Sequence, residues 1–214
     1  MAYIEPPRRI PLILRLGIAI AERKTGRPML AARLLAWFPR AALSSGILEA
    51  LVAHGDRDVD ARTLKLVRMQ VSFAVSCPFC IDMNSFRYEL KGITDEEVRA
   101  LQGELEIGGV ATFNARERAA LLYTREACRT PLSFTPEVIG EVRSLFGERG
   151  MVILATTIGQ VNFWARTIQA LGVPPAGFGE QCSIEQRNLL KIERYSTLYA
   201  KADPADETRG QAGR

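Results

Sequence analysis

Apolar residues recur at helical spacing along most of the chain. The segment TLKLVRMQVSFAV, residues 63–75, shows the pattern clearly, because positions three and four residues apart share one helix face. Its apolar face comprises Leu64, Val67, Val71, Ala74 and Val75, and its polar face comprises Lys65, Arg68 and Ser72. Alternation with a period of two is scarce, and no hairpin signal is present. The pattern predicts an all-α protein of roughly eight helices.

Short polar motifs predict where several helices begin. TDEE at 94–97 and NARE at 114–117 have the spacing of capping boxes, in which two side chains satisfy free backbone N–H groups. TPE at 135–137 places proline at the first helical position, where its missing N–H costs nothing. SIEQ at 183–186 predicts the start of a last helix.

The charge of the chain is unevenly distributed. Apolar residues make up 47% and charged residues 24%, as in ordinary globular proteins. The net charge is +4, but residues 1–40 hold eight basic and two acidic side chains, a balance of +6. A basic amphipathic start suits an anionic surface, a membrane or nucleic acid, and the simpler interpretation is a solvated helix face. Aromatic residues do not interleave with these arginines, so no nucleic-acid partner is expected.

The apolar run IPLILRLGIAIA, residues 10–21, does not predict a membrane span. It contains Arg15, is too short to cross a bilayer and lacks a convincing cleavage site. We therefore expect a cytoplasmic protein without a transmembrane segment. A stable structural disulfide is not expected in a reducing cytoplasm, so a CxxC pair there indicates metal or redox chemistry.

The stretch SCPFC, residues 76–80, holds such a pair. The preceding helix should end near Ser76, and Pro78 suits the first position of a new helix. Cys77 then falls at the N-cap and Cys80 in the first turn. Free N–H groups and the positive end of the helix dipole favour a thiolate there, and the two sulfurs lie within disulfide reach.

Other interpretations of the pair are a metal site or two buried cysteines. A structural zinc site needs four ligands, but the chain has one histidine, His54, and two isolated cysteines, Cys128 and Cys182. No metal site is therefore expected. No P-loop or G-x-G-x-x-G motif is present either, so no bound cofactor is expected. The proline, the N-cap position and the compartment together favour redox chemistry over two buried cysteines.

Two long segments resemble the alkylhydroperoxidase D-like, carboxymuconolactone decarboxylase superfamily. They are ARTLKLVRMQVSFAVSCPFCIDMNSFRYELKGITDEEVRAL, residues 61–101, and FNARERAALLYTREACRTPLSFTPEVIGEVRSLFGERGMVILATTIGQVNFWARTIQALGVP, residues 113–174. The resemblance implies an AhpD-like all-helical fold and assembly into homo-oligomers. The implied layout is a basic helical extension at 1–44, an AhpD-like core at 45–178, a C-terminal helix at 179–202 and a polar tail at 203–214.

The hydroperoxidase members imply a peroxidase cycle for this pair. Carried to this chain, Cys80 attacks the hydroperoxide and becomes a sulfenic acid, and Cys77 condenses with it to a disulfide. An external dithiol, either a reductant protein or a small thiol, then resets the pair by exchange. Helix electrostatics alone leave Cys77 open as the attacking thiol.

The chain departs from the active members at two relay positions. Their glutamate corresponds to Lys65, and their histidine corresponds to Asn84, which cannot take a proton near neutral pH. Lys65 is a candidate for stabilising the thiolate or an exposed helix residue. Asp82 is a candidate base or a structural carboxylate. Asn84 is a candidate for orienting a water or a peroxide, or a polar contact.

The sequence therefore predicts a thiol-dependent hydroperoxide reductase that uses Cys80 and Cys77. The pair argues against the decarboxylase members, which lack it. The alternative is an AhpD-fold protein with a degenerate proton relay. Such a protein acts as a redox sensor, a dithiol exchanger or a small-ligand binding module without significant peroxidase turnover.

Overall fold

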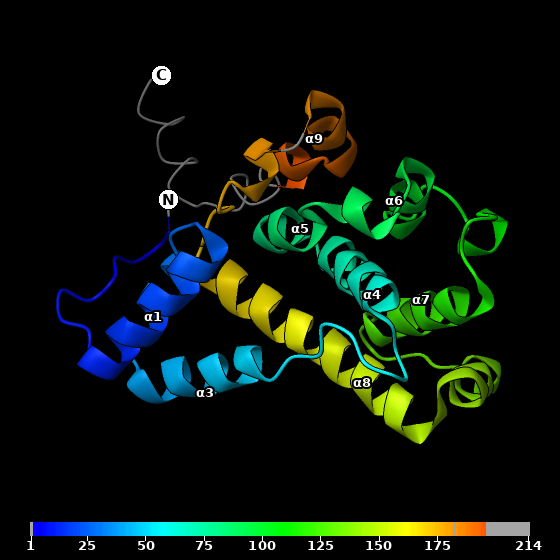
Figure 1. Ribbon diagram of the computed structural model, residues 1–214, viewed down its shortest axis with the longest axis horizontal. Coiled ribbons are helices and arrows are strands. Elements are labelled where there is room, and N and C mark those ends of the chain that lie inside the picture. Colours follow the sequence, from blue (N-terminus) through cyan, green and yellow to red (C-terminus); the bar gives the residue numbers. More distant parts are fainter. Residues whose placement is uncertain (1, 182, 196–214) are drawn as a thin grey trace, which may run out of the picture.

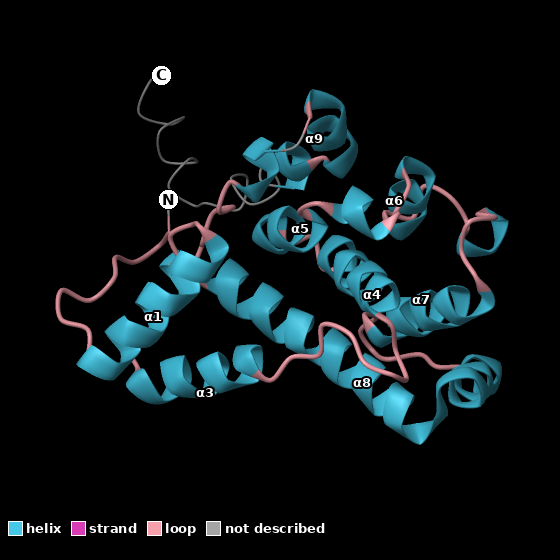
Figure 2. Ribbon diagram, viewed as in Figure 1, coloured by secondary structure: helices cyan, strands magenta, loops and turns pink. Residues whose placement is uncertain are grey.

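Every regular element in the computed structural model is helical within the residues it describes, 2–181 and 183–195 (Figure 2). This confirms the predicted fold class, with nine α-helices and three short 3-10 helices in that range. The α-helices are α1 (Leu12–Thr25), α2 (Leu30–Leu35), α3 (Pro39–Ala50), α4 (Ala61–Ala74), α5 (Pro78–Ser85), α6 (Asp95–Leu101), α7 (Ala115–Ala127), α8 (Pro136–Ala170) and α9 (Ile184–Leu190). The 3-10 helices are η1 (Tyr88–Lys91), η2 (Ile107–Gly109) and η3 (Phe178–Gln181).

Two of the predicted segment boundaries fall inside helices of the structure. The proposed boundary between residues 44 and 45 falls inside α3, and the one between 178 and 179 falls inside η3. Residues 196–202 of the predicted C-terminal helix and the predicted polar tail, 203–214, lie outside the described residues. The division itself stays a prediction.

Helix α4 is the centre of the fold. It packs against α5, α7 and α8, which surround it in Figure 1. The apolar face predicted for this segment is confirmed at Leu64, Val67 and Val71, which are buried. The predicted polar face is wrong, since Arg68 and Ser72 are also buried, and Ala74 is exposed. Arg68 and Ser72 have internal partners: the Ser72 hydroxyl donates to the Arg68 carbonyl at 2.7 Å, and the Arg68 guanidinium donates to the carbonyl of Ala53.

The helix starts predicted from local motifs are confirmed. The segments 94–97, 114–117 and 183–186 each form a complete capping box, in which both reciprocal hydrogen bonds are present. Thr135 caps α8, and Pro136 is its first residue. Helix α8 is kinked at Gly147, which has a non-helical backbone conformation with φ of 65°. Glycine adopts a positive φ readily because it has no Cβ atom.

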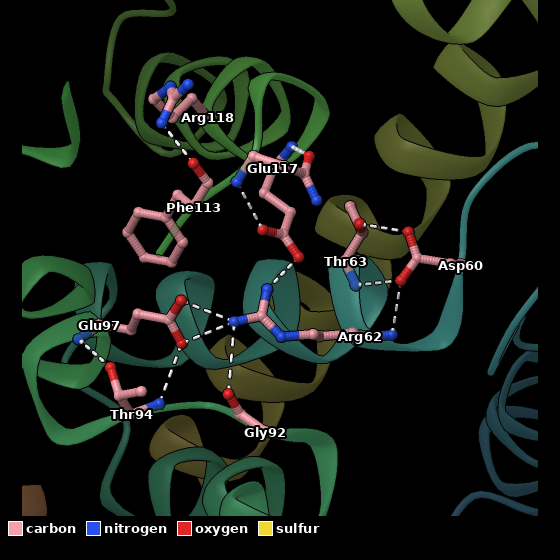
Figure 3. A network of polar contacts seen from close by, with 10 residues as sticks. Asp60, Arg62, Thr63, Gly92, Thr94, Glu97, Phe113, Glu117 and Arg118 are labelled. Carbon is pink, nitrogen blue, oxygen red and sulfur yellow. Dashed lines mark hydrogen bonds and ion pairs between the residues drawn. The ribbon is translucent and has the colours of Figure 1, made fainter. Parts of the chain in front are cut away.

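One guanidinium joins the N-termini of three helices (Figure 3). Arg62 donates to both carboxylate oxygens of Glu97, at 2.6 and 2.8 Å, and to Glu117. These two glutamates complete the capping boxes of α6 and α7, and both are buried. Asp60, the N-cap of α4, accepts from the Arg62 backbone N–H at 2.9 Å. Burial alone would lower the pKa of Arg62, but the hydrogen bonds to Glu117 and Glu97 raise it above its ordinary value.

Replacing Arg62 should destabilise the fold strongly. Arg62→Met leaves two buried carboxylates without their cation, and we expect the free energy of unfolding to fall by about 3–5 kcal/mol. Arg62→Lys keeps the charge and loses the fork geometry, so its loss should be intermediate. Urea unfolding at neutral pH measures both variants.

The matched control is Arg143→Met. Arg143 pairs with Glu148 at 2.9 Å, and both side chains are largely exposed. An exposed pair of this kind contributes about 0–1 kcal/mol. Equal losses for Arg62→Met and Arg143→Met would contradict a central role for the Arg62 network.

Candidate functional site: the Cys77–Cys80 pair

The cysteine pair lies at the turn from α4 into α5. Ser76 adopts a left-handed conformation with φ of 50°, and Cys77 is extended. Pro78 is the first residue of α5, and the Cys80 N–H donates to the Cys77 sulfur at 3.2 Å. The predicted N-cap position of Cys77 is therefore confirmed. The structure joins the two cysteines as a disulfide, with 5.2 Å between their Cα atoms.

Both cysteines are buried, with Cys77 0% and Cys80 1% exposed. They belong to an apolar cluster formed by several elements that are far apart in the sequence. Its other buried members are Ala31 and Leu34 of α2, Phe79 of α5, Ala165 and Ile168 of α8, and Val173. A reagent that reacts with the sulfurs therefore has to displace part of this cover, and α2 is the element that comes from the basic N-terminal region.

Lys65 and Asn84, the candidate relay residues predicted from the sequence, make contacts that fix α5 in place. The Lys65 ammonium donates to the carbonyl oxygen of Phe86, just after α5, at 2.8 Å. The Asn84 amide donates to the Ser72 hydroxyl on α4 at 3.0 Å. Both contacts tie the C-terminal end of α5 to the neighbouring α4. A role of Lys65 or Asn84 at the thiol itself stays a prediction.

Asp82 connects the site to a segment almost one hundred residues away. Its carboxylate accepts hydrogen bonds from the backbone N–H groups of Gly177, Phe178 and Gly179, at 2.9, 3.1 and 2.5 Å. The side chain is buried, so these three donors replace its hydration shell. Of the two interpretations offered by the sequence, this geometry favours the structural carboxylate. Nothing in the local sequence pattern indicates this long-range contact.

A group of hydrogen-bonded polar side chains lies next to the cysteine cluster. The sequence pattern does not predict it. Trp164 packs against the cysteine cluster, and its indole N–H donates to the Glu49 carboxylate at 2.9 Å. The same carboxylate oxygen accepts from the Gln160 amide at 3.0 Å. Glu49 belongs to α3, so the N-terminal layer is attached to α8 next to the candidate site. Within the described residues, no group of three or more His, Cys, Asp or Glu side chains is placed to hold a metal ion.

Cys128 differs from the pair in both position and chemistry. It follows α7 as the C-cap residue and is half-buried. Burial raises the pKa of its thiol, although the Asn162 amide, a hydrogen-bond donor at 3.8 Å, acts in the opposite direction. A raised pKa makes a thiol a weaker nucleophile at neutral pH. Cys182 lies outside the described residues.

Solved structures share this arrangement of helices. A peroxidase-related protein from Ralstonia eutropha JMP134, described as an alkylhydroperoxidase AhpD core, superimposes with a TM-score of 0.67 over 81% of this chain and 92% of its own, at 16% identity. The chain has the AhpD-like fold. A peroxidase-related protein from Silicibacter sp. TM1040 gives a TM-score of 0.68 over 81% of this chain and 91% of its own, at 17% identity.

The AhpD-like fold is also found in a debrominase. The debrominase Bmp8, solved in complex with 2,3,4-tribromopyrrole, gives a TM-score of 0.68 over 89% of this chain and 97% of its own, at 19% identity. Among curated proteins, the uncharacterized protein YdfG of Bacillus subtilis is 29% identical over 115 residues, which are 53% of this chain and 76% of YdfG. No protein-family model matches the chain.

Removing the Asp82 carboxylate should loosen the contact between α5 and residues 177–179. We expect Asp82→Ala to lower the free energy of unfolding by about 3 kcal/mol, because three buried N–H donors lose a charged acceptor. Glu89→Ala removes an exposed carboxylate of η1 and should change the free energy by less than about 0.5 kcal/mol. Urea unfolding of both variants measures the difference, and similar values would contradict the structural role of Asp82.

Proposed function

We propose that this protein is a thiol-dependent reductase of hydroperoxides, in which Cys77 and Cys80 cycle between dithiol and disulfide. The observation that carries the proposal is the position of the pair. Cys77 is the N-cap of α5, its sulfur accepts from the Cys80 N–H, and the two sulfurs are bonded within one helical turn. The AhpD-like fold supports the proposal because two of its solved examples are peroxidase-related proteins.

The cycle has three balanced steps. The Cys80 thiolate attacks the terminal peroxide oxygen, the O–O bond breaks, and the alkoxide leaves and takes a proton, so that Cys80 becomes a sulfenic acid. The Cys77 thiol attacks the oxidised sulfur, water leaves and the disulfide forms. An external dithiol, either a protein or a small thiol, then reduces the disulfide by exchange and is itself oxidised. Neither a metal nor a bound cofactor takes part in the proposed cycle.

The environment of the pair has opposing effects on this chemistry. The free N–H groups and the dipole at the start of α5 favour the thiolate, whereas burial among apolar side chains disfavours it. Asn84 cannot supply the proton transfer of a histidine. In the proposal, Lys65, Asn84 and Asp82 act by holding α5, and water supplies the proton to the leaving group. We therefore propose that the protein turns over hydroperoxide slowly. If peroxide turnover is insignificant, the alternative function is that of a redox sensor or a dithiol exchanger.

A second candidate substrate class follows from the apolar surroundings. Phe79, Ile168 and Trp164 pack in the apolar cluster around the pair, and a substrate entering there would meet contacts that favour a flat apolar ring over a small polar peroxide. The similarity to the debrominase Bmp8 points in the same direction. The dithiol would supply two electrons, a C–Br bond would be replaced by C–H, and bromide would leave as the disulfide forms. Release of bromide from 2,3,4-tribromopyrrole by the reduced protein tests this candidate.

Compartment and assembly complete the proposal. The cytoplasm would supply the dithiol reductant that the cycle requires. None of the helices in the described ranges combines the length and apolarity needed to span a bilayer. For the homo-oligomer implied by the family resemblance, the exposed apolar side chains of Leu43, Ile47 and Leu48 on α3 offer a contact surface.

Substituting the attacking cysteine should abolish peroxide consumption. We expect Cys80→Ser to lower the rate by about 10²-fold or more, to that of free cysteine, because serine does not reduce a peroxide. Cys77→Ser should still react once and leave a sulfenic acid at Cys80, since the resolving thiol is missing. Stopped-flow consumption of cumene hydroperoxide by the pre-reduced protein measures the rates, and mass spectrometry with dimedone detects the sulfenic acid.

Cys128→Ser is the matched control. It removes a thiol outside the pair and should consume peroxide at the wild-type rate. If wild type, Cys80→Ser and Cys128→Ser all react at the rate of free cysteine, the protein is not a peroxidase. If Cys77→Ser is inactive while Cys80→Ser accumulates the sulfenic acid, the roles of the two cysteines are reversed.

A further inference from the structure

Helix α1 exposes an apolar stripe that no described element covers. Leu12, Ile13, Leu16 and Ile20 are 71%, 74%, 62% and 61% exposed, and Ile18 is the only buried residue of the helix. The spacing of the exposed four places them on one face. Single exposed leucines are normal on protein surfaces, but a continuous apolar face indicates a contact surface. In Figure 1, α1 lies at the edge of the molecule, on the side opposite α6 and α7.

Basic side chains lie at both ends of this helix and on the face next to the stripe. Arg8, Arg9 and Arg15 line a hollow of about 580 Å³ between the segment before α1 and α1 itself. Glu22, the acidic side chain that also lines it, is occupied by Arg33 at 2.8 Å and by the Met29 N–H at 3.0 Å. No other acidic side chain in the described part of the chain lines the hollow. The far end of the helix is also basic, with Arg23 and Lys24 in its last turn.

We propose that α1 and the arginines around it dock on an anionic phospholipid surface. The apolar stripe would lie at the boundary between headgroups and acyl chains, and the guanidinium groups would bind lipid phosphates. A helix of 14 residues is about 21 Å long, shorter than the hydrocarbon core of a bilayer, so it lies in the plane of the interface. The proposal is independent of the chemistry of the cysteine pair.

Charge decides between a lipid surface and a second copy of the chain. A two-fold contact places the same patch of both copies face to face, which would bring the basic side chains at α1, namely Arg8, Arg9, Arg15, Arg23 and Lys24, close to those of the second copy. The whole chain has a net charge of +4, so the residues after position 40 contribute only −2 and cannot neutralise such a contact. An anionic membrane covers the stripe and compensates the arginines at once. Nucleic acid would compensate the charge and leave the stripe exposed.

Vesicle co-sedimentation of the full chain tests the proposal. We expect binding to vesicles of phosphatidylcholine and phosphatidylglycerol, little binding to phosphatidylcholine alone, and weaker binding as salt is raised. Arg8→Gln/Arg9→Gln/Arg15→Gln should weaken binding by about 10²-fold, roughly fivefold for each arginine. Leu12→Ser/Leu16→Ser should weaken it by at least about tenfold. Circular dichroism confirms that the variants fold, as expected for exposed positions.

Two matched controls separate the stripe from general surface effects. Leu90→Ser removes an exposed leucine of η1, and Arg99→Gln/Arg187→Gln removes exposed arginines of α6 and α9. Leu90→Ser should bind like wild type, and the second control should weaken binding far less than the triple variant. The proposal is overturned if the wild type does not bind mixed vesicles or binds neutral ones equally well. It is also overturned if Leu12→Ser/Leu16→Ser lowers the mass of an oligomer that does not bind vesicles.

Discussion

Two carboxylates buried beside one guanidinium organise the core of this protein. Glu97 and Glu117 are each required locally, because each closes the capping box of its helix. Their burial would be unfavourable without a cation, and Arg62 supplies it through hydrogen bonds to both. Arg62 stands in the first turn of α4, next to the Asp60 cap, so the N-termini of α4, α6 and α7 meet at one point. The direction of α4, and with it the position of the turn into α5, follows from this constraint.

Helix α5, which carries the cysteine pair, is attached to α4 and to residues 177–179. Asn84 and Lys65 attach the end of the helix to α4, and Asp82 attaches its middle to residues 177–179. The two candidate relay residues, Lys65 and Asn84, thus anchor α5. The consequence is a pair with an ordered backbone and a sealed apolar environment. Chemistry at this pair depends on access past α2 as much as on the acidity of its thiols.

Much of the local structure could be predicted from the sequence, because the interactions that determine it span only a few residues. The capping boxes, the proline at the start of α8 and the N-cap position of Cys77 are of this kind. The burial of Arg68 and Ser72 could not be predicted, because the pattern of α4 does not show that three helices surround it. The partners of Asp82 and the bridge made by Arg62 join residues tens of positions apart. Such contacts leave no periodic signal in the chain.

The disulfide links an N-cap to the first turn of the same helix, and the two cysteines are three residues apart. A cross-link stabilises a fold mainly by closing a long loop of the unfolded chain, and a ring this small excludes few conformations. No second element of the fold is tethered by it, so breaking the bond leaves the connectivity between helices as it was. The bond is therefore a covalent constraint on a single helical turn. The arrangement of the other helices does not depend on it.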